Sequence, residues 1–182
     1  MGVSTLLEAE AQGFKVSYRP MTLTHRLVVL AVVLISTFSS ASEPANARLR
    51  QVIEARNATF SAAIANQDLA TAASLYDVNV IFQAPGAPTI RGRAGVVNFL
   101  IQQVTAGAVE VSLTTESVRT FIALDNGSLE VEEIGTNIIT YVVQGQRIAV
   151  PGKYMVIWRF PRGLSSEPVI VRDSFSFSVP FP

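Results

Sequence analysis

Residues 66–100 read NQDLATAASLYDVNVIFQAPGAPTIRGRAGVVNFL and contain the signals of four successive elements. Asp68 can accept backbone N–H groups, so it predicts the start of a short helix. Residues 78–82, VNVIF, are mostly β-branched or aromatic and predict a strand. The Pro-Gly-Ala-Pro run at 85–88 predicts a turn, and apolar residues recur at helical spacing beyond Gly92. The segment therefore predicts helix, strand, turn and helix in that order.

The flanking sequence extends this segment to one α+β domain. Residues 45–65 have apolar positions at helical spacing and predict an amphipathic helix. After the helices come four β-rich segments separated by turn residues or by a loop expected at 161–168. These segments are 109–124, 129–143, 147–160 and 169–179. Because the helices come first and long strands follow, we expect a mostly antiparallel sheet rather than alternating βαβ units.

The N-terminal region has the pattern of a targeting segment. Arg26 precedes an apolar run at 27–38, and small residues follow it. This pattern is typical of a secretory signal peptide near 21–41, and the run is shorter than the roughly 20 residues of a bilayer span. A signal anchor is the alternative. We expect an extension and signal peptide in 1–41, a secreted or extracytoplasmic domain over 42–182, and no stable membrane span after cleavage.

Composition argues against several classes of function. The chain has 14 basic and 14 acidic residues, so it offers no basic face and we expect no nucleic-acid partner. It has no cysteine, and its one histidine, His25, lies in the segment expected to be removed. The mature domain then lacks the side chains for Ser-His-Asp or Cys-His catalysis, and we expect no metal and no cofactor. Asn57 and Asn126 begin N-x-S/T sequons, which matter only in a eukaryotic source.

Later segments extend the pattern of the opening stretch: EEIGT at 132–136, GKYMVIWR at 152–159 and VRDSF at 171–175. Together these parts resemble the nuclear-transport-factor-2-like superfamily, in its SnoaL-like and ketosteroid-isomerase-like branch, over roughly 53–177. The resemblance implies a cone-shaped domain in which N-terminal helices pack within a strongly curved, mostly antiparallel sheet. It also implies a deep, mostly apolar pocket, and an open sheet face through which relatives dimerise. A homodimer is therefore an expectation.

The same resemblance argues against the best-known reaction of this branch. It places the ketosteroid-isomerase general base at Ala84, the oxyanion tyrosine at Phe60 and the protonated aspartate of the oxyanion site at Val156. That reaction needs a carboxylate to move the proton and two O–H donors to hold the enolate. None of the three residues supplies these groups, so we expect no ketosteroid-isomerase activity of that type.

The implied pocket has a set of expected lining residues from the first helix, the first strand and the C-terminal strands. They are Phe60, Tyr76, Phe82, Ala84, Tyr154, Val156, Trp158 and Asp173. Alternation along 147–160 places Tyr154, Val156, Trp158 and Phe160 on one face of a strand. If Val156 faces the pocket, Tyr154 and Trp158 line it too; the alternative is that these aromatic residues are simply core.

Asp173 is the first candidate for a catalytic acid or base. It lies between Val171 and Phe175 on a face that is otherwise apolar. A buried carboxylate there is costly unless it is paired. Asp173 therefore either forms an ion pair with an arginine or is a pocket acid with a raised pKa.

Glu132 and Tyr76 are weaker candidates. Glu132 faces the same way as Ile134 and Ile138, and it is either a pocket acid, an ion-pair partner or a solvated side chain. Tyr76 is expected to end the short helix beside the first strand, with its hydroxyl at the rim of the pocket. Tyr154 completes the set of catalytic candidates.

Three functions fit these observations. The preferred one is a secreted domain whose apolar pocket binds a small hydrophobic molecule, without demonstrated catalysis. The second is a SnoaL-like enzyme that uses Asp173, Tyr154 or Glu132 for proton transfer of the isomerase, cyclase or hydratase type. The third is a dimeric association module, as in calcium/calmodulin-dependent kinase.

Overall fold

The computed structural model describes residues 42–178. The helices are α2 (Ser42–Ala65), α3 (Leu69–Ser74) and α4 (Arg93–Thr105). The strands are β1 (Tyr76–Gln83), β2 (Ile90–Arg91), β3 (Ala108–Ala123), β4 (Leu129–Val143), β5 (Gln146–Leu164) and β6 (Val169–Phe177). The expected extension and signal peptide lie outside the described residues and stay a prediction. Within 42–178, no helix has both the length and the apolar composition needed to cross a membrane.

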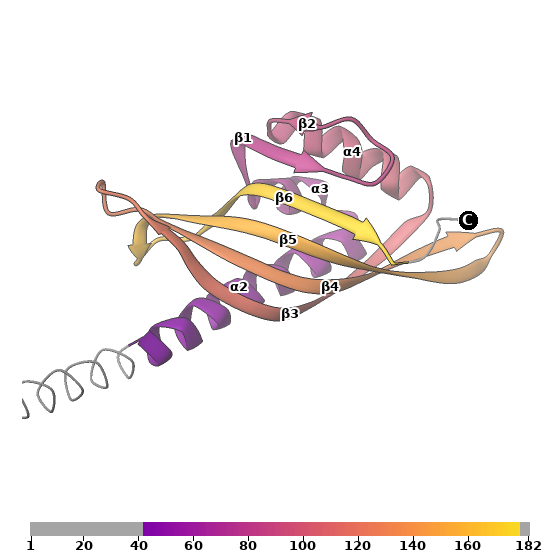
Figure 1. The fold of residues 1–182 in the computed structure, drawn as a ribbon. Coiled ribbons are helices and arrows are strands. Elements are labelled where there is room, and N and C mark those ends of the chain that lie inside the picture. Colours follow the sequence, from indigo (N-terminus) through magenta and orange to yellow (C-terminus); the bar gives the residue numbers. More distant parts are fainter. Residues whose placement is uncertain (1–41, 179–182) are drawn as a thin grey trace, which may run out of the picture. The chain divides into compact units, whose positions relative to one another are not determined.

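The strands form one curled, open sheet in the order β2-β1-β6-β5-β4-β3. Every neighbouring pair is antiparallel except β1 and β6, which run parallel. The helices α2, α3 and α4 lie behind the sheet in the view of Figure 1, on its inner face. The apolar core forms where these helices pack against the inner side of β4, β5 and β6. The predicted α+β class and helices-first order are confirmed.

The first short helix is capped as predicted but ends earlier. Asp68 accepts hydrogen bonds from the Thr71 hydroxyl at 2.6 Å and from the Thr71 backbone N–H at 3.0 Å, and these bonds lower the pKa of Asp68. The prediction that Tyr76 ends this helix is wrong, because Tyr76 is the first residue of β1. Its neighbour Leu75 offers its carbonyl oxygen to the N–H of Ile170 on β6, which draws the chain into the sheet.

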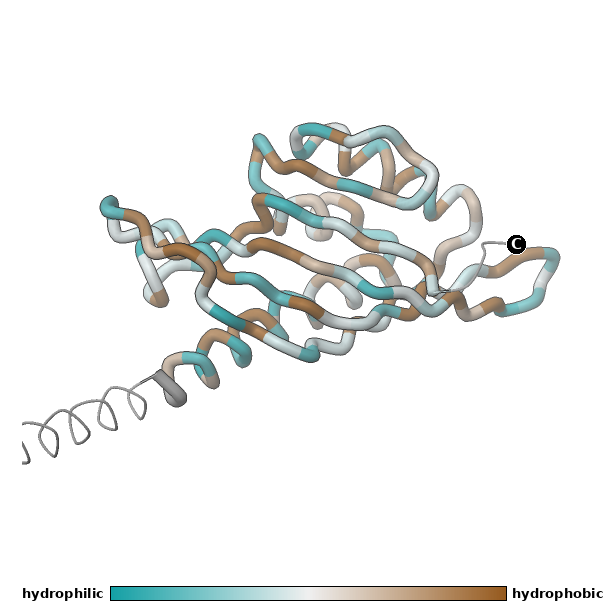
Figure 2. Tube along the Cα trace, in the orientation of Figure 1, coloured by the Kyte–Doolittle hydropathy of each residue, from teal (hydrophilic) through white to brown (hydrophobic). Residues whose placement is uncertain are grey.

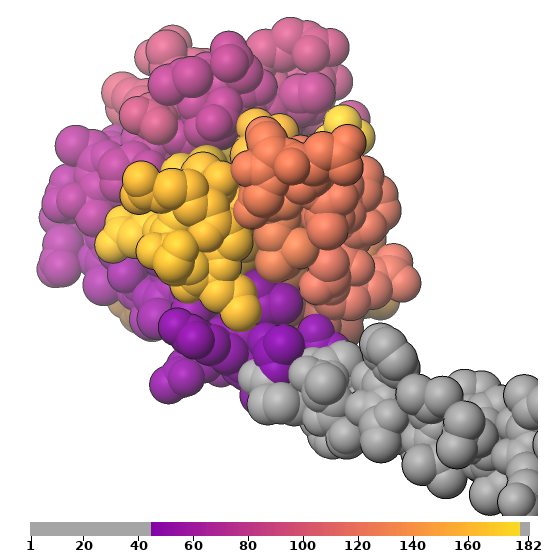
Figure 3. All heavy atoms as spheres, turned by 90° about the vertical axis from the view of Figure 1, so that its left-hand side faces the viewer, coloured from indigo at the N-terminus to yellow at the C-terminus, as the bar shows by residue number. Residues whose placement is uncertain are grey.

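The strand β5 is longer than predicted, because it continues to Leu164 where a loop was expected from residue 161. Only residues 165–168 separate it from β6. The end of β5 lies beside the turn between β3 and β4, and Figure 3 shows these orange and yellow segments packed together. At the end of this extension, the half-buried Leu164 packs against the apolar core.

Successive side chains along each strand point to opposite faces of the sheet, so one face is buried and the other is exposed to solvent. Tyr154, Val156, Trp158 and Phe160 are all buried on the inner face, as predicted. Their neighbours on the outer face include apolar side chains that stay exposed, such as Ile138 at 46 %. Figure 2 shows the resulting change between brown and teal along the long strands. The homodimer through this outer face stays a prediction.

Candidate functional site

A cavity of about 90 Å³ lies between the inner face of the sheet and the helices α2 and α4. Its wall is mostly apolar, with aromatic rings from all three sides. The polar side chains on the wall are few: Asn57, Tyr76, Gln103, Asn137, Tyr154, Trp158 and Asp173. An apolar cavity with a few convergent polar groups is the usual form of a small-molecule site.

The structure brings most of the expected lining residues together. Those on the cavity wall are Phe60, Tyr76, Phe82, Tyr154, Val156, Trp158 and Asp173. Ala84 is buried in the core but does not line the cavity, because β1 has ended at Gln83 and Ala84 begins the turn. The role of the seven residues as ligand contacts stays a prediction.

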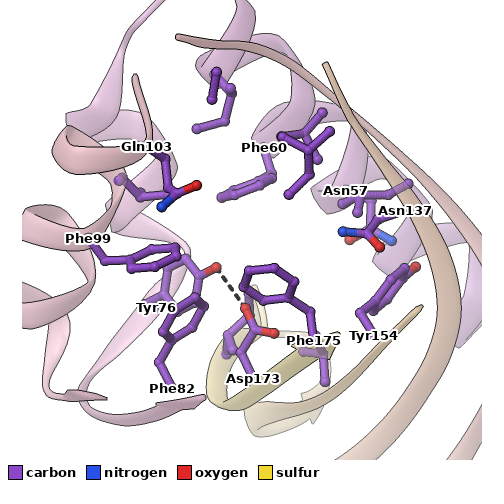
Figure 4. Close-up of a pocket in the computed structure, with 18 of the residues that line it drawn as sticks. Asn57, Phe60, Tyr76, Phe82, Phe99, Gln103, Asn137, Tyr154, Asp173 and Phe175 are labelled. Carbon is purple, nitrogen blue, oxygen red and sulfur yellow. Dashed lines mark hydrogen bonds between the residues drawn. The ribbon is translucent and has the colours of Figure 1, made fainter. Parts of the chain in front are cut away.

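Asp173 is a buried acid without a cationic partner. Its side chain is on the cavity wall, and its Oδ2 accepts a hydrogen bond from the Tyr76 hydroxyl at 2.8 Å (Figure 4). No arginine or lysine of the described residues forms an ion pair with it. Burial raises the pKa of Asp173 to about 7, although the Tyr76 bond lowers it, and the nearby Glu133 adds to the rise. The ion-pair interpretation is therefore wrong.

An irregularity in the sheet turns Asp173 inward. Between β5 and β6 the register shifts, so that Ile157 pairs with Arg172 while Trp158 pairs with Ile170. Val171 and Arg172 consequently lie over the outer groove, whereas Asp173 faces the cavity. The prediction that Val171 shares the face of Asp173 is wrong, because simple alternation ignores this bulge.

Tyr76 lies deeper than the rim that the sequence predicted. It is 2 % exposed, and its ring contacts Phe60 and Phe82 edge-on at centroid distances of 6.3 and 6.2 Å. Burial, with the charge of Asp173, raises the pKa of the Tyr76 hydroxyl well above its usual value. The hydroxyl therefore keeps its proton and remains a donor to Asp173.

A second buried acid, Glu133 on β4, was not among the sequence candidates. It is fully buried, and its Oε1 accepts from Asn57 Nδ2, Thr115 Oγ1 and Tyr154 Oη at 2.6–2.7 Å. Its Oε2 accepts from Trp158 Nε1 at 2.8 Å. Burial and the Glu133 charge raise the pKa of Tyr154, so this phenol also stays protonated. Glu133 thus holds three cavity-wall residues, Asn57, Tyr154 and Trp158, from behind the wall.

Glu132 lies on the opposite face from Glu133. Its Oε1 accepts from Arg119 Nε at 2.6 Å in an ion pair across β3 and β4. The pocket-acid and solvated interpretations of Glu132 are wrong, because it is buried on the outer face beside this arginine. The sequence signal for Glu133 was the pair Tyr154 and Trp158, whose polar tips need a partner when their rings are buried.

Two glycines on β4 and β5 leave room for polar side chains on the inner face. Gly135 pairs with Tyr154, and Gly152 pairs with Asn137. A Cβ at Gly135 would meet the Tyr154 phenol at 2.6 Å. The missing side chain lets Tyr154 lie across β4 and reach Glu133.

Asn57 belongs to the structural part of this site. Its side chain is 7 % exposed, and its amide donates to Glu133. A glycan on that nitrogen would not fit in the folded protein, so the sequon at Asn57 is not a glycosylation site of this fold. Within 42–178, no group of three or more His, Cys, Asp or Glu side chains could hold a metal ion.

No protein-family model matches the chain, and no curated protein matches it. Solved structures do match it. A ketosteroid isomerase-like protein from Erwinia carotovora atroseptica superposes with a TM-score of 0.56 at 15% identity, over 71% of this chain and 96% of that one. A candidate calcium/calmodulin dependent protein kinase II association domain from Xanthomonas campestris gives 0.55 at 15% identity, over 71% and 87%.

A hexachlorocyclohexane dehydrochlorinase from Novosphingobium barchaimii gives a TM-score of 0.55 at 12% identity, over 71% of this chain and 86% of that one. These identities are low, so the likeness concerns the fold. The matched structures include enzymes and an association domain, and they do not select one function. The chain therefore has the cone fold of the nuclear-transport-factor-2-like superfamily, which the sequence resemblance predicted.

Proposed function

We propose that the cavity binds a compact, mostly apolar molecule and that Asp173 anchors a polar group of this molecule. One observation carries the proposal: a buried carboxyl group stands on an apolar cavity wall with only the neutral Tyr76 as its partner. Its second oxygen, Oδ1, makes no hydrogen bond to a described residue. Oδ1 is not a fully enclosed atom, so it is open to the cavity, where a ligand hydroxyl can donate a hydrogen bond to it.

The volume of the cavity limits the size of the molecule. At about 90 Å³ it is smaller than the roughly 150 Å³ apolar cavity that is known to hold benzene in another protein. The cavity wall includes three half-buried side chains, those of Phe99, Gln103 and Phe175. Rotation of these side chains would enlarge the cavity enough to admit a six-membered ring. A steroid or a long lipid chain would need a much larger rearrangement.

Phenol and benzene are suitable probes, because they differ by one hydroxyl group. We would titrate the purified full-length chain with each and follow the methyl signals by NMR. Ile139 lines the cavity and Ile138 lies on the outer face of the same strand. The proposal predicts shifts at Ile139, none at Ile138, and about tenfold tighter binding of phenol than of benzene.

Asp173→Leu gives the matched test of the anchor. This variant should bind both probes with similar affinity, because the hydroxyl of phenol loses its partner. Tyr76→Phe is the control, since it keeps the carboxyl group and should keep the preference for phenol. Shifts at Ile138 alone, or no binding of either probe, would contradict the proposal.

A second candidate function is proton transfer to a bound substrate, and the pKa of Asp173 near 7 favours it. A group with such a pKa exchanges its proton readily at neutral pH. Of the other catalytic candidates, Glu132 is on the outer face and Tyr154 gives its hydrogen bond to Glu133. Asp173 would take a proton from a carbon beside a carbonyl group, leave an enolate, and return the proton to carbon.

Deuterium exchange tests this candidate without knowledge of the natural substrate. Cyclohexanone in D₂O, followed by proton NMR, reports loss of the protons beside the carbonyl. Wild type should exceed Asp173→Asn by at least about tenfold, and its rate should rise as pH passes 7. Equal rates in the two proteins would leave binding as the function.

A further inference from the structure

The most unusual polar group in the cavity is Asn137 on β4. Its side chain is on the cavity wall and only 5 % exposed, yet its Oδ1 has no hydrogen-bond partner. None of the hydrogen bonds among the described residues uses its amide nitrogen either. Buried side-chain amides are nearly always hydrogen-bonded, so an unpaired one needs a specific explanation.

The sheet is shaped to hold this amide. Gly152 lies directly opposite Asn137 across β4 and β5, and a Cβ there would collide with Asn137 Oδ1 and with the carbonyl oxygen of Ser176. The backbone of Gly152 lies outside the positive-φ region, so conformation does not require glycine there. Glycine at this position therefore leaves room for both the Asn137 side chain and the β6 backbone at Ser176.

The other polar groups near Asn137 already have partners. Asn57 donates to Glu133 and Thr115, and the Tyr154 hydroxyl donates to Glu133. Figure 4 shows these residues with Asn137 on one side of the cavity, and the bonded pair of Tyr76 and Asp173 on the other. Asn137 is thus the side chain among them that makes no hydrogen bond to a described residue, so both its amide oxygen and its amide nitrogen can bond a ligand.

We propose that Asn137 is a second hydrogen-bonding subsite of the cavity, and that the ligand is a compact molecule with two polar groups on an apolar body. This inference rests on the proposed function, in which Asp173 anchors one polar group. The Asn137 amide has a donor and an acceptor, so a hydroxyl or a carbonyl group satisfies it. The ligand class is therefore a diol or a hydroxy-carbonyl compound of about one ring.

The test compares phenol with catechol, resorcinol and hydroquinone, which add a second hydroxyl in each of the three positions. Dissociation constants for the full-length chain come from the NMR titration described above. At least one diol should bind about three- to tenfold tighter than phenol. Asn137→Leu should remove this gain, so that no diol binds tighter than phenol to this variant. Asn79→Leu, on the outer face, should behave as wild type.

Thermal stability separates a binding role from a structural one. Asn137→Leu replaces an unpaired buried amide by an apolar group of similar size, so its melting temperature should equal or exceed that of wild type. Asn137→Ala provides a second variant with the same loss of hydrogen bonding and no added bulk. Weaker binding of phenol and diols by the same factor in both variants, together with lower melting temperatures, would overturn the inference.

Two further outcomes distinguish the inference from the function on which it rests. If phenol binds through Asp173 and no diol exceeds it, the Asn137 subsite is wrong and the proposed function stands. If phenol itself does not bind, the proposed function fails and the subsite fails with it.

Discussion

Glu132 and Glu133 are neighbours on β4, yet they lie on opposite faces of the sheet and their hydrogen-bond partners differ in charge. Glu132 faces outward and is paired with the cation of Arg119. Glu133 faces inward and is held by four neutral donors from α2, β3 and β5. Glu130 and Arg159 form a second ion pair of this kind on the outer face.

Among residues 42–178, no arginine or lysine forms an ion pair with the inward acids Glu133 and Asp173. Asp173 is the second inward acid, and its partner Tyr76 is neutral as well. Burial without a compensating charge favours the protonated carboxyl group, which is why the pKa of Asp173 is raised. The two faces therefore differ in how they satisfy their acids: ion pairs with arginines on the outer face, and neutral hydrogen-bond donors on the inner face. On the inner face, Glu133 has four such donors and Asp173 has one.

The largest expected effect is on the pH dependence of stability. The folded pKa of Asp173, about 7, is above its ordinary value of 3.8, so its stabilising contribution is complete below about pH 4 and lost as pH rises through 7. Asp173→Asn cannot ionise, so it should gain on wild type by up to about 4 kcal/mol between these limits. Urea unfolding at several pH values measures this difference. Parallel curves for the two proteins would refute the raised pKa.

The next largest effect is the difference in stability between variants of the two glutamates. Glu133→Leu removes the acceptor shared by four donors, of which Asn57, Tyr154 and Trp158 are buried, and we expect a loss of about 3 kcal/mol or more in the free energy of unfolding. Glu132→Leu should cost less, because Arg119 is exposed and returns to water. Denaturant unfolding of both variants decides the point. Equal losses would mean that the faces do not differ in the way described.

The smallest effect concerns the glycine that shapes the inner face. Gly135→Ala places a Cβ against the Thr114 carbonyl oxygen and the Tyr154 phenol, and should cost about 1–3 kcal/mol. Thr136→Ala, one residue away on the outer face, should stay within about 0.5 kcal/mol. The ultraviolet spectrum of the tyrosines should also change only in Gly135→Ala. A neutral Gly135→Ala would show that Tyr154 does not need this space.

The sequence predicted the fold because its signals are local. Asp68 predicts the start of a helix, and the Pro-Gly turn at 85–88 predicts the end of a strand. Alternation in β5 predicts that Tyr154 and Trp158 lie on one face. These features follow from neighbouring residues alone. The end of α3 was missed because Leu75 is drawn into the sheet by Ile170, far along the chain.

The site was predicted less completely, because its geometry depends on pairing between strands. Alternation does not distinguish Glu133 from Glu132, because both alternating sets of β4 mix polar and apolar residues. Asn137 gave no signal without its partner Gly152 on β5. Asp173 was found, but the bulge that turns it inward and the hydroxyl of Tyr76 that binds it were not.

The most direct measurement is the titration of the Asp173 carboxyl carbon by ¹³C NMR in the full-length chain, with Asp173→Asn to assign the signal. The carboxyl group of an acid held in an apolar cavity by a neutral partner should titrate with a midpoint near 7. A midpoint near 4, the ordinary value for aspartate, would contradict the account. It would mean that water or a cation reaches Asp173 and that the inner face does not differ from the outer one.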